Sequence, residues 1–91
     1  MKSILQDEKR CYICGSTQWL ERHHVMNGYD RSKSEKYGLT VYLCHYCHNE
    51  PPNGVHYNRK LSDALKRVAQ ERFDEVHGEG AFFKEFGKNY K

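Results

Sequence analysis

Long hydrophobic runs are missing from this 91-residue chain, in which only 37% of the residues are hydrophobic. None of its apolar runs approaches the roughly 20 residues that a membrane-spanning helix needs, so we expect no membrane partner. The charged N-terminus, MKSILQDEKR, also lacks the apolar stretch of a secretory signal. These two absences predict a cytoplasmic protein.

Material for a large core is scarce as well. Charged residues make up 30% of the chain, and we find no internal repeat, low-complexity tract or linker. A chain of this length forms one domain, residues 1–91, and its core is so small that a disulfide or a metal is expected to stabilise it. Fifteen basic against 12 acidic residues give a net charge of +3. That charge is compatible with a nucleic-acid partner.

Four cysteines form two Cys-x-x-Cys pairs, each the core of a zinc knuckle. The first pair is Cys11 and Cys14, followed by Gly15, and the second is Cys44 and Cys47. Two such turns close a tetrahedron of thiolates around zinc. Disulfides are disfavoured because we expect a reducing cytosol, and no thioredoxin-like βαβ pattern supports a redox role. We predict a structural zinc held by all four cysteines.

Six histidines are a high number for a chain of this length. His77 lies at an expected helix end, where its charge suits the helix dipole. His45 falls inside the second knuckle, where we expect it to be exposed. The other four are candidates for a second site. They are His23, His24, His48 and His56.

Two β-strands are expected around the histidine pair. Residues 18–26 form the first, with Trp19 and Leu20 as apolar anchors. Residues 39–43 form the second, which runs directly into the second cysteine pair. The polar residues 29–38 between them are interpreted as a loop. Together with a helix, this hairpin gives an α+β fold.

The C-terminal third has helical periodicity. Apolar residues recur every three or four positions from Leu61 to Val76, with Asn58 as a candidate N-cap and Gly78 as a stop. The opposite face carries Lys60, Lys66, Arg67 and Glu71. We interpret these charges as a solvated surface, and the phenylalanines of residues 81–86 as core.

Three motifs follow one another in a recognisable order. They are Cys-x-x-Cys, the segment Leu20 to Val25 (LERHHV) and the segment Tyr42 to His48 (YLCHYCH). Together they resemble the HNH endonucleases of the ββα-metal fold, most closely the subclass with a four-cysteine zinc site that is common among restriction-type and bacteriophage nucleases. The resemblance covers about residues 11–58, and a helical part over about residues 58–91 is compatible with it.

The resemblance implies a fold and an activity. The fold is a ββα-metal finger, a β-hairpin plus a helix, braced by the four-cysteine zinc site and followed by an amphipathic helix. The activity is that of a metal-dependent endonuclease, which hydrolyses DNA phosphodiester bonds. A neutral imidazole, with an ordinary pKa of about 6.5, suits the task of taking a proton from water at neutral pH.

The family pattern implies roles for individual histidines. It makes His24 the general base, and His23 and His48 ligands of a catalytic Mg²⁺, Mn²⁺ or other divalent metal. This metal needs its own site because four thiolates leave zinc no open position. The family's middle asparagine, which braces the loop, corresponds to Leu39 here, and Asn27 is a candidate substitute.

One more metal ligand usually follows a helical turn later in the family. That position is Pro52, which has no ligand atom. His56 is the nearest substitute, and Asn49 and Asn58 are alternatives.

DNA contacts are expected from basic residues that flank the site in sequence. The predicted contacts are Arg22, Arg31, Lys33 and Lys36, and Arg59 and Lys60 also lie nearby. Such contacts give an affinity that is independent of sequence and falls with salt. The tyrosines that could stack on bases are Tyr29, Tyr37, Tyr46 and Tyr57. Core packing is the preferred role for most of these.

Two rival functions fit parts of the pattern. A non-catalytic zinc-finger module that binds nucleic acid or protein would keep the cysteines but leave the histidines without a role. The other rival is a nuclease that needs a recombination or phage partner protein, or a second copy of the chain. The resemblance suggests a phage or mobile-element protein acting in a bacterial host cell.

Overall fold

A two-stranded antiparallel sheet lies at the centre of the computed structural model, which describes residues 2–51 and 54–90. Strand β1, Leu20–His24, pairs with strand β2, Thr40–Cys44. The first strand is shorter than the sequence predicts, and the second is shifted by one residue. With the helices described below, the sheet makes a small α+β structure.

The connection between the strands is helical, so the prediction of a loop there is wrong. A 3-10 turn, η1 (Gly28–Asp30), leads into helix α1 (Arg31–Tyr37). Ser34 of α1 is fully buried, and its hydroxyl accepts the Met26 N–H at 2.9 Å and donates to the Met26 carbonyl at 2.6 Å. A polar side chain thus anchors this helix, which apolar periodicity cannot reveal.

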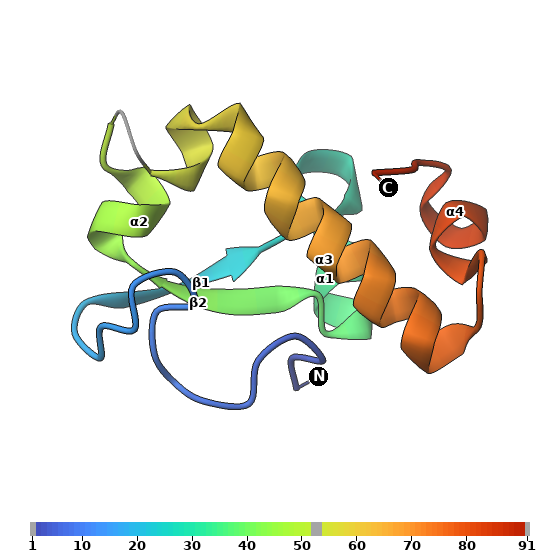
Figure 1. The fold of residues 1–91 in the computed structure, drawn as a ribbon, viewed down its shortest axis with the longest axis horizontal. Coiled ribbons are helices and arrows are strands. Elements are labelled where there is room, and N and C mark those ends of the chain that lie inside the picture. The colour runs from blue at the N-terminus through green and yellow to red at the C-terminus, as the bar shows by residue number, and fades with distance from the viewer. Residues whose placement is uncertain (1, 52–53, 91) are drawn as a thin grey trace.

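Helix α2, His45–Asn49, follows β2 directly and packs against both strands. A second 3-10 turn, η2 (Val55–Tyr57), leads into the long helix α3 (Arg59–His77), and helix α4 (Ala81–Phe86) ends the fold. Figure 1 shows α3 crossing the molecule, with α2 near one end and α4 near the other. None of the helices in the described part of the chain is both long and apolar enough to span a membrane.

The limits of α3 agree with the sequence pattern. Asn58 caps it, because its side-chain oxygen accepts the Leu61 N–H at 3.1 Å, and Gly78 follows its last residue. Its buried side chains are Leu65, Ala69, Gln70 and Phe73. Val68 and Val76, which the periodicity assigned to the same face, are exposed, so the buried stripe is narrower than predicted.

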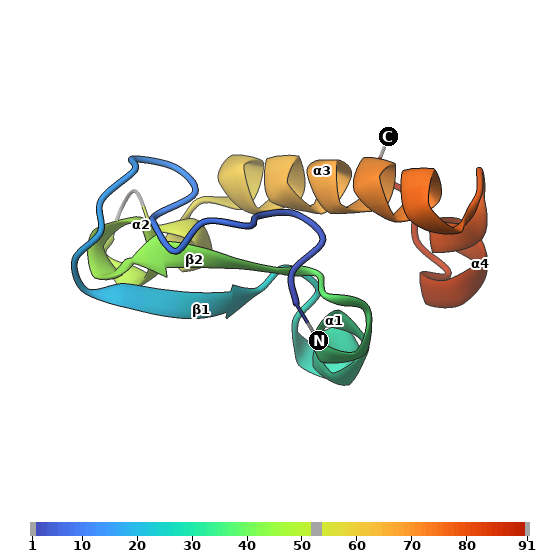
Figure 2. The ribbon, with the colours of Figure 1, turned by 90° about the horizontal axis from the view of Figure 1, so that it is seen from below.

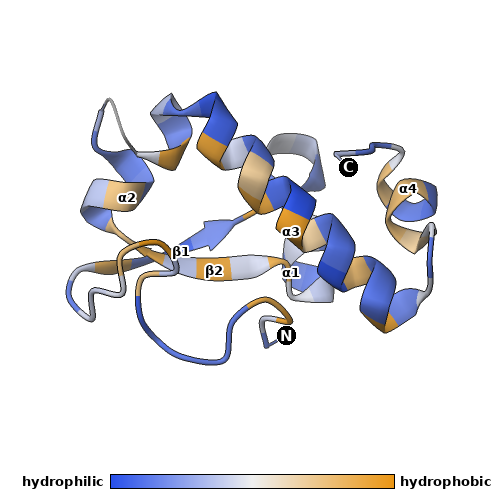
Figure 3. Cartoon of the chain, in the orientation of Figure 1, coloured by the Kyte–Doolittle hydropathy of each residue, from blue (hydrophilic) through white to orange (hydrophobic). Residues whose placement is uncertain are grey.

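The core extends from β2 to the C-terminal helix. In Figure 3, β2 is largely hydrophobic, whereas hydrophobic and hydrophilic stretches alternate along α3. Phe82 and Phe86 of α4 are buried with their rings stacked 4.5 Å apart, but Phe83 is exposed. Residues 3–12 follow β2 (Figure 2), where the Tyr12 N–H donates to the Tyr42 carbonyl at 2.8 Å.

Several aromatic residues that we expected in the core are exposed. Trp19 is 81% exposed and takes a left-handed φ of 52°, so it is not an apolar anchor of the strand. Its carbonyl accepts the His45 N–H at 3.0 Å. Tyr29, Tyr46 and Tyr57 are also exposed, with Tyr29 at 94%. The preference for core packing is therefore wrong for these three tyrosines.

Candidate metal and catalytic site

The four cysteines form one cluster. Their sulfur atoms all lie within 4.8 Å of one another, with Cys14 Sγ 3.6 Å from Cys44 Sγ, and none is in a disulfide. A tetrahedral zinc with Zn–S bonds of about 2.3 Å places its sulfurs roughly 3.8 Å apart. The cluster therefore fits a metal such as zinc, as the paired spacing predicted.

Local backbone geometry closes the first knuckle. Gly15 has a φ of 80°, and its N–H donates to the Cys11 carbonyl at 2.9 Å, a conformation that favours glycine. Burial opposes ionisation of Cys11, but hydrogen bonds from the backbone N–H groups around it prevail and lower its pKa to about 6. Burial raises the pKa of Cys47. A cation between the sulfurs would let all four ionise together.

Three histidines converge in a second cluster. His23 comes from β1, His48 from α2 and His56 from η2, and their candidate ligand atoms lie within 4.8 Å of one another. The Nε2 atoms of His48 and His56 are 2.9 Å apart. Three elements that are separate in sequence thus deliver one imidazole each to the same point.

The structure also places the alternatives to His56. Asn49 donates from Nδ2 to a Glu21 carboxylate oxygen at 2.8 Å, and Asn58 caps α3. Pro52, the family position for this ligand, lies outside the described residues. Among the described candidates, His56 is therefore the one that joins the imidazole cluster.

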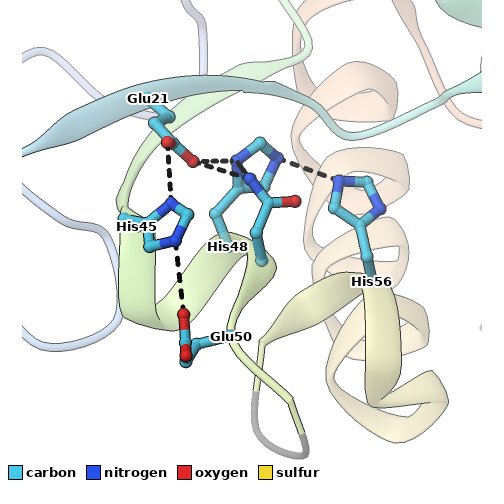
Figure 4. A network of polar contacts seen from close by, with 6 residues as sticks. Glu21, His45, His48, Glu50 and His56 are labelled. Carbon is cyan, nitrogen blue, oxygen red and sulfur yellow. Dashed lines mark hydrogen bonds and ion pairs between the residues drawn. The ribbon is translucent and has the colours of Figure 1, made fainter.

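Glu21 contacts His48, one ring of the cluster, on the side away from His56 (Figure 4). One of its oxygens is 2.7 Å from His48 Nδ1, and the other is 3.0 Å from His45 Nδ1. A carboxylate only accepts hydrogen bonds, so Nδ1 of His48 carries the proton and its Nε2 presents a lone pair toward His56. These hydrogen bonds from His48 and His45 lower the pKa of Glu21.

Sequence reasoning missed Glu21, although a signal for it exists. Side chains two residues apart on a strand share a face, so Glu21 and His23 of β1 lie on the same side. His45, which the sequence placed in the knuckle as an exposed residue, is exposed and also lies 3.2 Å from a Glu50 carboxylate oxygen.

Burial keeps the central imidazole neutral. His23 is only 3% exposed, and its burial, together with the nearby His48 and His56, lowers its pKa to about 3. Burial also lowers the pKa of His56. Neutral imidazoles are the form that binds metals, so this environment suits a ligand set.

His24 lines a hollow beside the imidazole cluster. It is the last residue of β1, so the chain turns immediately after it, and both histidines of the pair line this hollow of about 280 Å³. We call this the histidine hollow. His24 Nε2 lies 2.8 Å from a Glu35 carboxylate oxygen, and Arg22 forms an ion pair with Glu35 at 3.0 Å. Nε2 therefore donates, and Nδ1 is left as the acceptor.

The loop after β1 is held without an asparagine side chain at residue 39. Leu39, where the resemblance would place an asparagine, is fully buried and bonds through its backbone. Ser34 holds the loop after β1 through Met26, and Glu35 holds His24. Both come from α1, the helix that sequence reasoning missed.

The four predicted DNA contacts separate into two pairs. Arg22 and Arg31 line the histidine hollow. Lys33 donates to the Glu85 carbonyl at 2.8 Å, next to α4, and the Lys36 ammonium lies 5.2 Å from the centre of the Tyr37 ring. The structure thus brings the two arginines, but not the two lysines, to the histidines.

No family model, curated protein or solved structure matches this chain. The chemistry of its two donor sets is the guide to their use. Four thiolates fill the coordination of a tetrahedral zinc and leave no position for a substrate. Three imidazoles beside an open hollow leave positions for water or a substrate oxygen, which is the pattern of a catalytic metal site.

Proposed function

We propose that this protein is a metal-dependent endonuclease of the HNH type, which hydrolyses phosphodiester bonds in DNA. The observation that carries the proposal is the convergence of His23, His48 and His56 beside a hollow that His24 also lines. The antiparallel strands followed by α2, with the cysteine cluster at one end, support a ββα-metal arrangement.

The three clustered imidazoles would hold the divalent metal. All three donors are nitrogens, and such a set suits a transition metal better than Mg²⁺, which prefers oxygen ligands. When bound, the metal supplies positive charge that stabilises the phosphate and its leaving oxygen. The cysteine cluster would hold a structural zinc that fixes the start of α2.

His24 is the general base in this proposal. Its Nδ1 accepts a proton from the water that attacks phosphorus, because Nε2 is occupied by Glu35. Glu35 is a positioning residue that fixes the ring and its tautomer, and Arg22 restrains Glu35 by an ion pair. Arg22 and Arg31 at the rim of the hollow supply charge for the DNA backbone.

Plasmid nicking with Mn²⁺, Co²⁺ or Mg²⁺ tests the proposal. We expect His24→Ala to lower the nicking rate by about 10²- to 10⁴-fold and to leave metal affinity unchanged, and Glu35→Gln to lower the rate less. His45→Ala, an exposed imidazole outside the cluster, is the matched control. Undiminished nicking by His24→Ala would remove it as the base. An unmodified protein that nicks with none of these metals would favour the non-catalytic zinc module.

A further inference from the structure

A second hollow lies next to the histidine hollow, beside helix α3. Its volume is about 450 Å³, and Asn27 and His56 line both hollows. Tyr57, Arg59, Asp63 and Lys66 also line it. We call it the α3 hollow. Because Asn27 and His56 line both, the two hollows adjoin at these residues, and we call the two together the depression.

Cations line both parts of this depression. Arg22 and Arg31 line the histidine hollow, and Arg59 and Lys66 line the α3 hollow. The sequence had assigned Lys66 to a solvated surface. Lys66 instead lines the α3 hollow, so its positive charge lies within the depression.

We propose that the α3 hollow binds the DNA strand next to the phosphate that is cut, with Arg59 and Lys66 contacting backbone phosphates. This inference rests on the proposed function and deepens it. A strand that presents one phosphate to the imidazoles must carry its neighbouring phosphates across the surface on either side. Cations in the two adjoining hollows suit that requirement.

Two further features of the hollow fit a nucleic-acid strand. Tyr57 is 61% exposed, so its ring is accessible for stacking on a base. Arg59 is paired with Asp63 at 3.7 Å, but its side chain is 94% exposed. An exposed pair of this kind contributes little, so a phosphate can replace Asp63 as the partner of Arg59.

Asp63 gives the proposal a test of opposite sign. It is an acidic residue in the hollow, so its charge repels a phosphate that approaches Arg59. Asp63→Asn should therefore strengthen DNA binding, whereas Arg59→Ala and Lys66→Ala should weaken it. A gain of affinity cannot come from misfolding.

Binding is measured by fluorescence anisotropy of a short labelled duplex, with the zinc-loaded chain in a His24→Ala background that leaves the DNA uncut. Each phosphate contact contributes about 0.7 to 0.9 to the slope of log affinity against log salt. Loss of one contact should therefore raise Kd by about five- to eightfold in roughly 0.1 M salt. It should also reduce the magnitude of the slope by about 0.7 to 0.9. Lys60→Ala and Lys84→Ala remove the same charge outside both hollows and should have much smaller effects.

The outcomes separate this inference from the proposed function. If Arg59→Ala and Lys66→Ala bind no more weakly than Lys60→Ala, while the unmodified chain still nicks DNA, the α3 hollow is not the strand site. If the variants lose affinity as expected but the unmodified chain fails to nick DNA with any of the tested metals, the α3 hollow remains the DNA-binding surface and the proposed hydrolytic function is wrong. Weaker binding by Asp63→Asn would also overturn the inference.

Discussion

Replacing Glu21 should weaken metal binding by the imidazole cluster, although Glu21 is not one of the three proposed ligands. Its carboxylate lies 2.7 Å from His48 Nδ1 and fixes the tautomer in which Nε2 points into the cluster. In Glu21→Ala that restraint is lost, so the ring can turn and either nitrogen can carry the proton. In Glu21→Gln an amide oxygen can still accept the bond, but its charge is gone.

The size of the effect follows from this one hydrogen bond. Bonds to charged groups contribute about 1.5–3 kcal/mol, and neutral ones roughly half as much. The Glu21 side chain is 36% exposed, so the lower end of this range applies. We expect Glu21→Ala to weaken metal binding by about tenfold, which is about 1.4 kcal/mol, and Glu21→Gln by about threefold to fourfold.

Calorimetric titration of Co²⁺ into the zinc-loaded chain measures these changes. His45→Ala is the matched control, because it removes another partner of Glu21 but leaves the bond to His48 in place. Zinc content, measured separately, should stay constant in all three variants. Wild-type affinity in Glu21→Ala would refute the reasoning, and so would an equal loss in His45→Ala, since the bond to His48 could not then be the cause.

Two other predictions concern the framework. Cys47→Ser should release the zinc and also weaken metal binding at the imidazoles, because Cys47 and His48 are neighbours on α2. Elemental analysis would measure the zinc loss, and the same calorimetry would measure the weaker binding at the imidazoles. Full zinc retention would contradict the prediction. Lys88→Met should destabilise the fold by about 1–3 kcal/mol in urea unfolding, because it leaves the buried carboxylate of Asp30, 2.7 Å from the Lys88 ammonium, without its ion pair. A loss of unfolding free energy of only a few tenths of a kcal/mol would contradict this prediction, because Asp30 would then not depend on Lys88.

The cysteine pairs were predictable because a short spacing constrains each of them, whereas the histidine cluster was expected from the family resemblance. Cys-x-x-Cys turns bring sulfurs together through a few covalent bonds, and His48 follows Cys47 directly. The strand that contains the first two histidines and the strand before the second knuckle had clear β patterns. The resemblance indicated which histidines could gather, and their roles as ligands and base stay predictions.

The missed features all depend on contacts between distant segments. Glu35 reaches His24 only because residues 31–37 form a helix, and that helix depends on the buried hydroxyl of Ser34. No apolar periodicity marks such a helix. Trp19 was misassigned for a related reason, since hydropathy predicts burial but its left-handed backbone takes the side chain outward.

The imidazole cluster is held by supports that differ for each ring. His23 lies within the sheet, where it pairs with Val41. His48 lies on α2, which is too short to be stable alone and is fixed by the cysteines and by packing on both strands. His56 depends on the return of the chain through Gly54, whose N–H donates to the Glu50 carbonyl at 2.7 Å.

Glycine is required at this return. A Cβ atom on Gly54 would lie 2.7 Å from the Glu50 backbone nitrogen and 2.9 Å from its carbonyl oxygen, closer than real contacts allow. Any larger residue would push η2 away from α2 and take His56 with it. The third imidazole is thus set by backbone packing between α2 and η2, while the first two are set by the sheet and the cysteine cluster. The convergence of the three rings is therefore a property of the whole fold and not of one motif.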